Sequence, residues 1–365
     1  MQTALAPAGV AEGRAAPERF LPLDAFRGLI MVLLVSDGFG LRALAKHPVF
    51  HGLAEQFEHV PWEGAVFYDT IAPAFLFMVG MAVPYALGLR TERGATFRDN
   101  LRHVAMRSLR LMLYSQVLIS IQSHRLHFQM HNILTHIAVA YFLCFLIMQW
   151  PFRYQALAGV GLLAAHTSLF FLFPGPDGPF TKTGNIGAVW DRALMGYNYA
   201  SWTTNLNMIS TTASALFGVW AGNLLRSGRP RSEQMKILTV AMAAGFASGL
   251  ALSPWVPIIR RIWTASLALY AVGWVLLMFL TLYVPIEVGG WRKLAFPFVV
   301  AGSNAIFIYT LDMILRRWLD ESVAVFTGKF TFLGAFGPVA QSCAVLLVMW
   351  SLCYWLYRHR IFLRL

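Results

Sequence analysis

Charged side chains are scarce in this sequence of 365 residues: Asp, Glu, Lys and Arg together make up 13% of it, whereas hydrophobic residues make up 58%. Soluble globular proteins carry about 25% charged residues, so this deficit excludes an ordinary water-soluble domain and indicates lipid as the main solvent. Cysteine is scarce too, and the three cysteines all fall in apolar stretches, which argues against a disulfide framework. Gly-rich phosphate loops, Walker motifs, zinc-hydrolase helices and nucleophile elbows do not occur in the sequence.

Long apolar runs dominate what is present. Spans of about 20 residues with short connections divide the chain into about ten segments. We therefore predict an all-α polytopic membrane protein with about ten transmembrane helices. A single transmembrane domain is expected over residues 19–365, preceded by a disordered cytoplasmic tail at 1–18. The predicted spans are residues 23–45, 65–88, 104–122, 134–150, 156–174, 207–225, 237–257, 264–286, 294–315 and 338–357.

The net charge of +12 is explained by membrane topology. With both the N- and C-termini in the cytoplasm, 19 of the 29 Lys and Arg residues lie on the inner side, as the positive-inside rule requires. These residues punctuate the spans instead of forming one patch, so no nucleic-acid partner is expected. The predicted location is the cell inner membrane.

The densest polar segment is His59-Val-Pro-Trp62-Glu-Gly64-Ala-Val-Phe-Tyr-Asp69, at the outer mouth of the second predicted span. An imidazole at His59 can take a proton from an attacking amine or hydroxyl, and Asp69 can fix its tautomer. The alternative is a histidine that is merely solvated in a loop. Asp69 lies in an apolar run and needs a polar partner on either interpretation.

Two other groups of polar residues have simple structural explanations. Asp24 and Arg27 are three residues apart on one helix face and can neutralise each other as a packing clamp at the membrane boundary. His124, His127 and His131 would share a helix face, but they lack cysteine or carboxylate partners, so no metal site is expected.

An ordered set of motifs resembles the heparan-α-glucosaminide N-acetyltransferase family of transmembrane acyltransferases. The motifs are Leu23-Asp24-Ala-Phe-Arg27-Gly28, His59-Val-Pro-Trp62-Glu-Gly64 with Asp69 and Pro73 to Gly80, Ile133 to Tyr141, Ile209 to Gly222, Arg261 to Ser266, and Trp291 to Pro297 with Gly302 to Tyr309. They run in family order over nearly the whole chain. The resemblance implies a member of the bacterial type, without the luminal domain of the animal enzymes.

The resemblance implies that acetyl-CoA from the cytoplasm supplies an acetyl group to an amino sugar or glycan on the far side. His59 matches the family's catalytic histidine, as general base or transient acyl carrier. Asp69 is expected to orient His59, and Asn304 to donate a hydrogen bond to the acceptor or the developing oxyanion. The residues expected to bind the acceptor are Ser36, Asp37 and Trp62, and those expected to hold the phosphates of CoA are Arg27, Arg90, Arg107 and Arg110.

The sequence departs from the family pattern at two positions. Asp37 follows Ser36 where the family often has asparagine, and His136 stands where arginine is frequent. The acceptor therefore stays open between amines and hydroxyls, as does the choice between direct transfer and an acetyl-histidine intermediate. A homodimer is also left open. The rival hypothesis is a non-enzymatic membrane protein, either a carrier of an anionic or glycan substrate or a structural subunit of a membrane complex.

Overall fold

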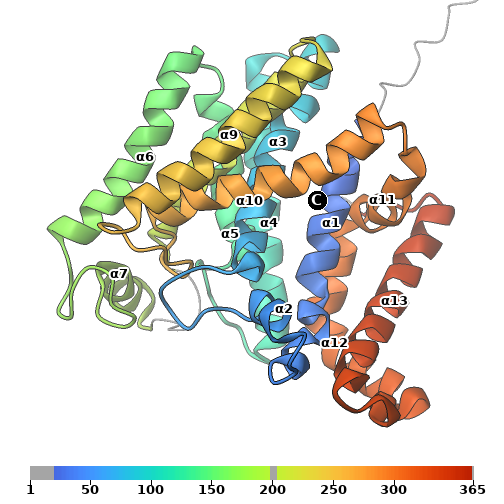
Figure 1. The fold of residues 1–365 in the computed structure, drawn as a ribbon. Coiled ribbons are helices and arrows are strands. Elements are labelled where there is room, and N and C mark those ends of the chain that lie inside the picture. The colour runs from blue at the N-terminus through green and yellow to red at the C-terminus, as the bar shows by residue number, and fades with distance from the viewer. Residues whose placement is uncertain (1–19, 198–203, 364–365) are drawn as a thin grey trace, which may run out of the picture.

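The computed structural model describes residues 20–197 and 204–363, which form α-helices and short 3-10 or π turns without a β-strand. The predicted tail at 1–18 lies outside the described residues. The long helices (Figure 1) are α1 Leu21–Val35, α3 Ile71–Glu92, α4 Phe97–Gln122, α5 Ile133–Ile147, α6 Phe152–Leu172, α8 Asn207–Arg226, α9 Arg231–Leu252, α10 Ala265–Tyr283, α12 Ala305–Thr327 and α13 Gly337–Arg358. The short elements are η1 Asp37–Leu44, α2 His51–Gln56, η2 Phe67–Thr70, α7 Ile186–Met195, η3 Val284–Val288, η4 Arg292–Ala295, α11 Phe296–Ser303 and η5 Gly328–Phe336.

Seven helical segments of the described residues are long and apolar enough to cross a membrane. The longest, of 54 residues, joins α12 and α13 through the turns of η5. Helices α1 and α5 have 15 residues each, or about 22 Å at the α-helical rise, which is shorter than a hydrocarbon core of about 30 Å. The polytopic helical architecture is thus confirmed, whereas the expected count of ten spans is not.

Two predicted spans are interrupted in the structure. The span expected at 23–45 ends as an α-helix at Val35, because the backbone from Asp37 to Gly40 has φ between 50° and 68°, which reverses the helical hand. The span expected at 294–315 breaks at Asn304, whose φ of −125° and ψ of 45° separate α11 from α12. Helix α12 then continues beyond the predicted end to Thr327.

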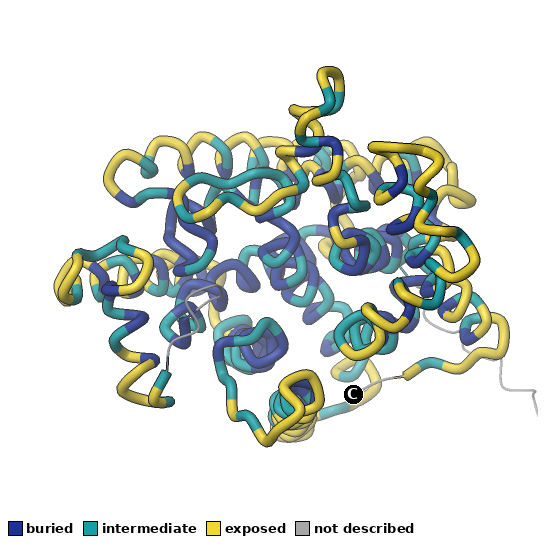
Figure 2. Tube along the Cα trace, turned by 90° about the horizontal axis from the view of Figure 1, so that it is seen from below, coloured by how far each residue is buried: buried dark blue, intermediate teal, exposed yellow. Residues whose placement is uncertain are grey.

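Close contacts between helices depend on glycine. A Cβ atom at Gly80 of α3 would collide with the backbone of Ala215 in α8, and one at Gly218 of α8 would collide with the backbone of Phe77. Gly28 of α1 meets α11 in the same way. Small residues allow helix backbones to approach closely, which is a main source of helix association in membranes. Helices α3 and α8 are accordingly the most buried membrane-crossing segments, and α9 is the least buried of them. Figure 2 shows the buried stretches of the chain in the middle of the bundle and the exposed stretches around it.

The loops gather at two ends of the bundle. At the first, here called the histidine end, the loop of residues 57–66 contacts the segments after α6 and α9, through Trp62 Nε1 to Phe180 O (2.7 Å) and Gly64 N to Ile258 O (2.8 Å). The opposite, arginine end carries the Glu92 ion pair with Arg226. Helix α3 joins the two ends with 22 residues, a length of about 33 Å.

Candidate functional site

A buried carboxylate at the histidine end contacts an imidazole and a guanidinium. Oδ1 of Asp69 lies 2.7 Å from Nδ1 of His59 and 2.9 Å from Nε of Arg260. The Asp69 side chain is fully buried and that of Arg260 is 9% exposed, whereas that of His59 is 40% exposed. Among the described residues no hydrogen-bond partner occupies Nε2 of His59. The ring is therefore held from its buried side and open on the other.

Local structure places Asp69 at the start of the third helix. It is the third residue of the turn η2, and its Oδ2 atom accepts hydrogen bonds from the backbone N–H groups of Val66 (3.2 Å) and Val60 (3.4 Å). The carboxylate thus orders both the turn before α3 and the loop that carries His59. Asp69 was expected to need a polar partner, and it has two, His59 and Arg260.

Arg260 comes from a constrained loop between α9 and α10. The backbone N–H of Ile259 donates to Thr264 Oγ1 (3.1 Å), and Asn207 of α8 donates to the carbonyl of Arg261 (2.9 Å). Trp263 is 1% exposed with a φ of 48°, an unfavourable conformation that the surrounding packing must stabilise. Burial lowers the pKa of the Arg260 guanidinium, and the neighbouring Asp69 carboxylate opposes that shift.

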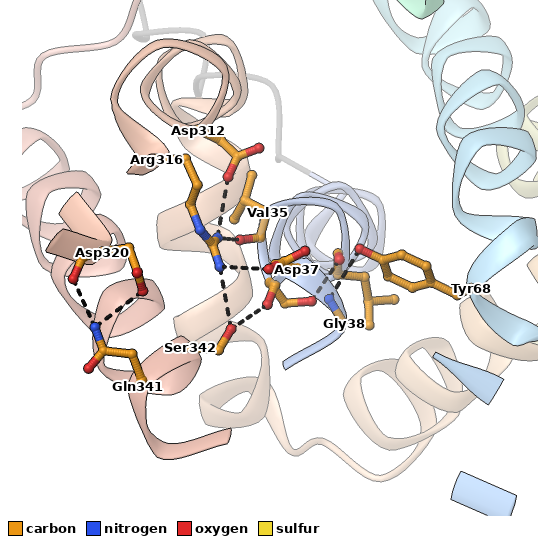
Figure 3. Close-up of polar contacts among 11 residues, drawn as sticks. Val35, Asp37, Gly38, Tyr68, Asp312, Arg316, Asp320, Gln341 and Ser342 are labelled. Carbon is orange, nitrogen blue, oxygen red and sulfur yellow. Dashed lines mark hydrogen bonds and ion pairs between the residues drawn. The ribbon is translucent and has the colours of Figure 1, made fainter. Parts of the chain in front are cut away.

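Tyr68 connects His59 to the end of the first helix. Its ring centroid is 4.9 Å from that of His59 at an interplanar angle of 37°, and its hydroxyl accepts a hydrogen bond from the backbone N–H of Gly38 (3.2 Å; Figure 3). Gly38 belongs to the left-handed turn from Asp37 to Gly40. The structure therefore brings Asp37 into the neighbourhood of His59 through one intervening side chain.

Arg316 of α12 contacts the start of this turn, at Val35 and Asp37 (Figure 3). Its guanidinium donates to the carbonyl of Val35 and pairs with Asp312 (3.3 Å), with Asp37 at 3.9 Å. The Asp37 side chain is itself 77% exposed. Val35 is the last residue of α1, so Arg316 satisfies a carbonyl that the helix end leaves without an intrahelical partner.

Three further residues expected in the site form hydrogen bonds within the fold. Ser36 is fully buried, and its hydroxyl donates to the carbonyl of Leu33 (2.8 Å). Trp62 donates its indole N–H to Phe180, as described above. Asn304 is also fully buried, and its amide bonds the backbone of the segment after α13, donating to the carbonyl of Ile361 (3.0 Å) and accepting from Leu363 (2.9 Å). The structure therefore brings His59 and Asp69 together, but it does not bring Asn304 to them.

Of the four arginines expected to hold phosphates, Arg90, Arg107 and Arg110 all lie close enough to His103 of α4 to act on it electrostatically, whereas Arg27 lies on another helix, α1. Arg27 pairs with Asp24 (3.4 Å) on α1, as expected for those two residues. Arg90 lies in the last turn of α3, while Arg107 and Arg110 lie on α4. Arg107 and Arg110 are 10 and 13 residues past the start of α4, a depth of about 15 to 20 Å along the helix. They are therefore well inside the bundle's length and not at its edge.

The arginine end contains a cavity of about 420 Å³ between α3, α4, α5 and α8. Its lining includes Thr91, Asn100 and Arg226. Asn100 accepts a hydrogen bond from Nε of Arg90 (2.9 Å), which places that guanidinium beside the cavity. Guanidinium groups suit phosphate oxygens, but Glu92 also lines the cavity and would repel an anion.

The histidines between α4 and α5 contact aromatic side chains. The ring centroids of His127 and His131 lie 5.1 and 6.0 Å from that of Tyr197, and His124 has a φ of 53° in the turn after α4. They do not share a helix face, because residues 124–132 of the described chain are not helical. Tyr199 and Trp202, which follow Tyr197 in the same loop, lie outside the described residues.

Comparison with known proteins extends the motif resemblance. The family model described as "Heparan-alpha-glucosaminide N-acetyltransferase, catalytic" matches residues 19–248, which include His59 and Asp69 and end before Arg260. The human protein named heparan-alpha-glucosaminide N-acetyltransferase is 23% identical over 363 residues, which cover 81% of this chain and 53% of the human one. The mouse protein of the same name is 23% identical over 378 residues, 84% of this chain and 55% of the mouse one. This chain thus spans about half the length of the curated relatives it matches, and it belongs to the heparan-alpha-glucosaminide N-acetyltransferase catalytic family.

Proposed function

We propose that this protein is a membrane acetyltransferase that moves an acetyl group from acetyl-CoA to an amine or hydroxyl of a sugar acceptor, with His59 at the reacting centre. The observation that carries the proposal is the bond from His59 Nδ1 to the buried Asp69 carboxylate, inside the family-matched segment, with the other ring nitrogen open. A histidine oriented from behind by a carboxylate is the arrangement used for general-base and nucleophilic catalysis.

The chemistry at His59 follows from its tautomer. Because Nδ1 donates its hydrogen to Asp69, Nε2 carries the lone pair and can accept the proton of the attacking amine or hydroxyl. The acceptor's electron pair then forms the new bond to the acetyl carbon while the carbon–sulfur bond breaks. The leaving sulfur takes up the proton held by the imidazolium. In the alternative route Nε2 itself attacks the acetyl carbon and the carbon–sulfur bond breaks, so that the CoA thiolate leaves. The acceptor then attacks the acetyl-histidine, the carbon–nitrogen bond to Nε2 breaks, and the acceptor's proton passes to the thiolate.

The donor is expected to enter from the arginine end. Arg90, Arg107 and Arg110 would hold its phosphates by charge and hydrogen bonds. Arg27 is not carried forward as a phosphate ligand, because it lies on α1 in an ion pair with Asp24. The depth of Arg107 and Arg110 along α4 shortens the distance that the acyl-bearing arm must cover to reach His59. In the predicted topology this end faces the cytoplasm and the membrane is the cell inner membrane.

The acceptor is expected at the histidine end. Asp37 is exposed there, and it is linked to His59 through Gly38 and Tyr68. A carboxylate at this position suits the ammonium form of an amino sugar. A carboxylate also accepts hydrogen bonds from hydroxyl groups, so neutral sugars remain acceptors in this proposal.

Transfer of labelled acetyl from acetyl-CoA to a panel of amino sugars and neutral sugars tests the proposal in purified protein. We expect transfer to at least one amino sugar, together with thermal stabilisation of the protein by acetyl-CoA, because a ligand that binds only the folded state stabilises it. Stabilisation without transfer to any acceptor would favour a carrier. Absence of both effects would favour a structural subunit.

A further inference from the structure

One oxygen atom of Asp69 contacts two side chains, those of His59 and Arg260, and only His59 has been assigned a role. His59 Nδ1 and Arg260 Nε both lie on Oδ1, at 2.7 and 2.9 Å. Arg260 reaches this atom from the loop after α9, far from the His59 segment in sequence. The carboxylate and the guanidinium are both almost completely withdrawn from solvent.

Burial makes the charge of this group important. An isolated carboxylate at such a depth would be strongly disfavoured, and a guanidinium stays protonated in proteins, so Asp69 and Arg260 form a neutral pair in the resting state. Without Arg260, the Asp69 carboxylate would favour protonation of the adjacent imidazole, because the imidazolium form of His59 would then be its only counter-charge. A protonated His59 has no lone pair with which to accept a proton from the acceptor.

The other charged and titratable groups near His59 are more exposed. Glu58, the preceding residue, is paired with Arg42 at 3.6 Å, and both side chains are about half exposed or more. The Tyr68 ring lies tilted against that of His59, the Asp37 side chain beyond it is 77% exposed, and Glu63 is exposed as well. Arg261 follows Arg260 in the same loop. Solvent screens exposed charges, so the contact with the greatest influence on Asp69, other than His59 itself, is Arg260.

We propose that Arg260 is a positioning residue for transfer: it neutralises Asp69 and fixes its Oδ1 atom, so that Asp69 orients His59 without drawing a proton onto it. This inference rests on the proposed role of His59, and it adds a residue that lies beyond the family-matched segment. Arg260 acts through Asp69 and has no contact with the acceptor in this scheme.

The test follows the protonation of His59 by a reaction that needs neither donor nor acceptor. Diethylpyrocarbonate modifies only unprotonated imidazole, and His59 is exposed enough to react. The modified fraction of the His59 peptide is measured by mass spectrometry across a pH series, in wild type, R260Q, R260K, D69N and the control R42Q. R42Q removes the same charge from an exposed site at the same end of the molecule.

We expect the pH of half-maximal modification to rise by about one unit in R260Q, because a positive charge near the carboxylate is lost. It should fall in D69N, where a negative charge is lost, and stay unchanged in R42Q. R260K keeps the charge and should remain within a few tenths of a unit of wild type. The double variant R260Q/D69N removes both charges of the pair and should return close to wild type, and it leaves no buried charge stranded if R260Q alone folds poorly.

The pH dependence of acetyl transfer provides the second readout. The acid limb of the rate profile should move upward in R260Q and be restored in R260K, with little change in acceptor KM. The inference would be overturned if the modification of His59 had the same pH dependence in wild type, R260Q and D69N. A shift in R42Q as large as that in R260Q would overturn it as well. If the pH dependence of His59 modification shifts as expected but no acetyl is transferred, the charge coupling between Arg260, Asp69 and His59 holds and the proposed function is wrong. The two failures are therefore distinguishable.

Discussion

At the scale of single residues, the left-handed turn after α1 explains why position 37 carries a short polar side chain. Asp37 has a φ of 50°, a region that asparagine, aspartate and glycine adopt more readily than other residues. Gly38 and Gly40, at 60° and 68°, adopt this region easily because they have no Cβ atom, and they flank Phe39, which has a φ of 55°. An asparagine at position 37, the residue expected from the family resemblance, would fit the same backbone.

Replacing Asp37 therefore separates conformation from charge. Asp37→Asn should leave the melting temperature within about a degree of wild type, because the backbone conformation is kept. It should raise the KM for amino-sugar acceptors several-fold, because an exposed charge-assisted contact is lost. Asp37→Val, which strains the positive φ, should destabilise the protein by about 1 to 3 kcal/mol. An unchanged KM for amino sugars in Asp37→Asn would remove Asp37 from the acceptor site.

The same scale shows which site contacts could be predicted. His59 and Asp69 lie in one short segment, so their chemistry and spacing were enough to expect the contact that the structure contains. Arg260 was not identified, because an arginine in a loop distant in sequence has no local signal that it will be buried against Asp69. The backbone partners of Asn304 could not be predicted either, because a sequence motif does not reveal that a residue at a helix break will bond the C-terminal segment.

At the scale of helices, apolar length and glycine pattern decide the fold. The predicted spans at 207–225 and 338–357 agree within a residue or two with α8 and α13, because a mainly apolar segment of this length satisfies its backbone groups in lipid by forming a helix. The ends of α1 and α11 could not be predicted, since the left-handed turn and the break at Asn304 depend on contacts from α12 and the C-terminal segment.

Two glycines of contrasting surroundings test the helix packing. Gly218→Ala places a methyl group against the backbone of Phe77 and should destabilise the protein by about 1 to 3 kcal/mol, as overpacking does. Gly161→Ala on α6 meets no atom within 4 Å and should be neutral or slightly stabilising through helix propensity. The melting temperatures of the two variants in one detergent provide the comparison. Equal melting temperatures would contradict the close packing of α3 against α8.

At the scale of the whole molecule, the proposed function assigns binding of the donor and chemistry at the acceptor to the two ends of α3. The structure places His59 and the Arg90 guanidinium at opposite ends of this helix. The assignment of the arginine end to the cytoplasm comes from the distribution of basic residues and stays a prediction. Transfer across the membrane requires that assignment.

Single cysteines at the two ends determine the orientation. Thr91→Cys lies at the end of α3, and Glu55→Cys lies on the exposed helix α2. In intact cells a membrane-impermeant thiol reagent should label position 55 and not position 91, while lysed cells should be labelled at both. The parent protein with its three native cysteines provides the background. Labelling of position 91 from outside would reverse the topology and exclude cytoplasmic acetyl-CoA as the donor.

The central claim is that His59 carries the chemistry while the donor is bound elsewhere, and His59→Ala tests it against His51→Ala. His51 is an exposed histidine at the same end, paired with Glu55 in the helix α2. His59→Ala should keep the wild-type melting temperature and acetyl-CoA affinity while transfer falls by a factor of about 10² to 10⁴, the usual contribution of a general base. His51→Ala should behave as wild type in all three measurements. Turnover in His59→Ala of at least half the wild-type value, with His59 intact in the control, would contradict the assignment.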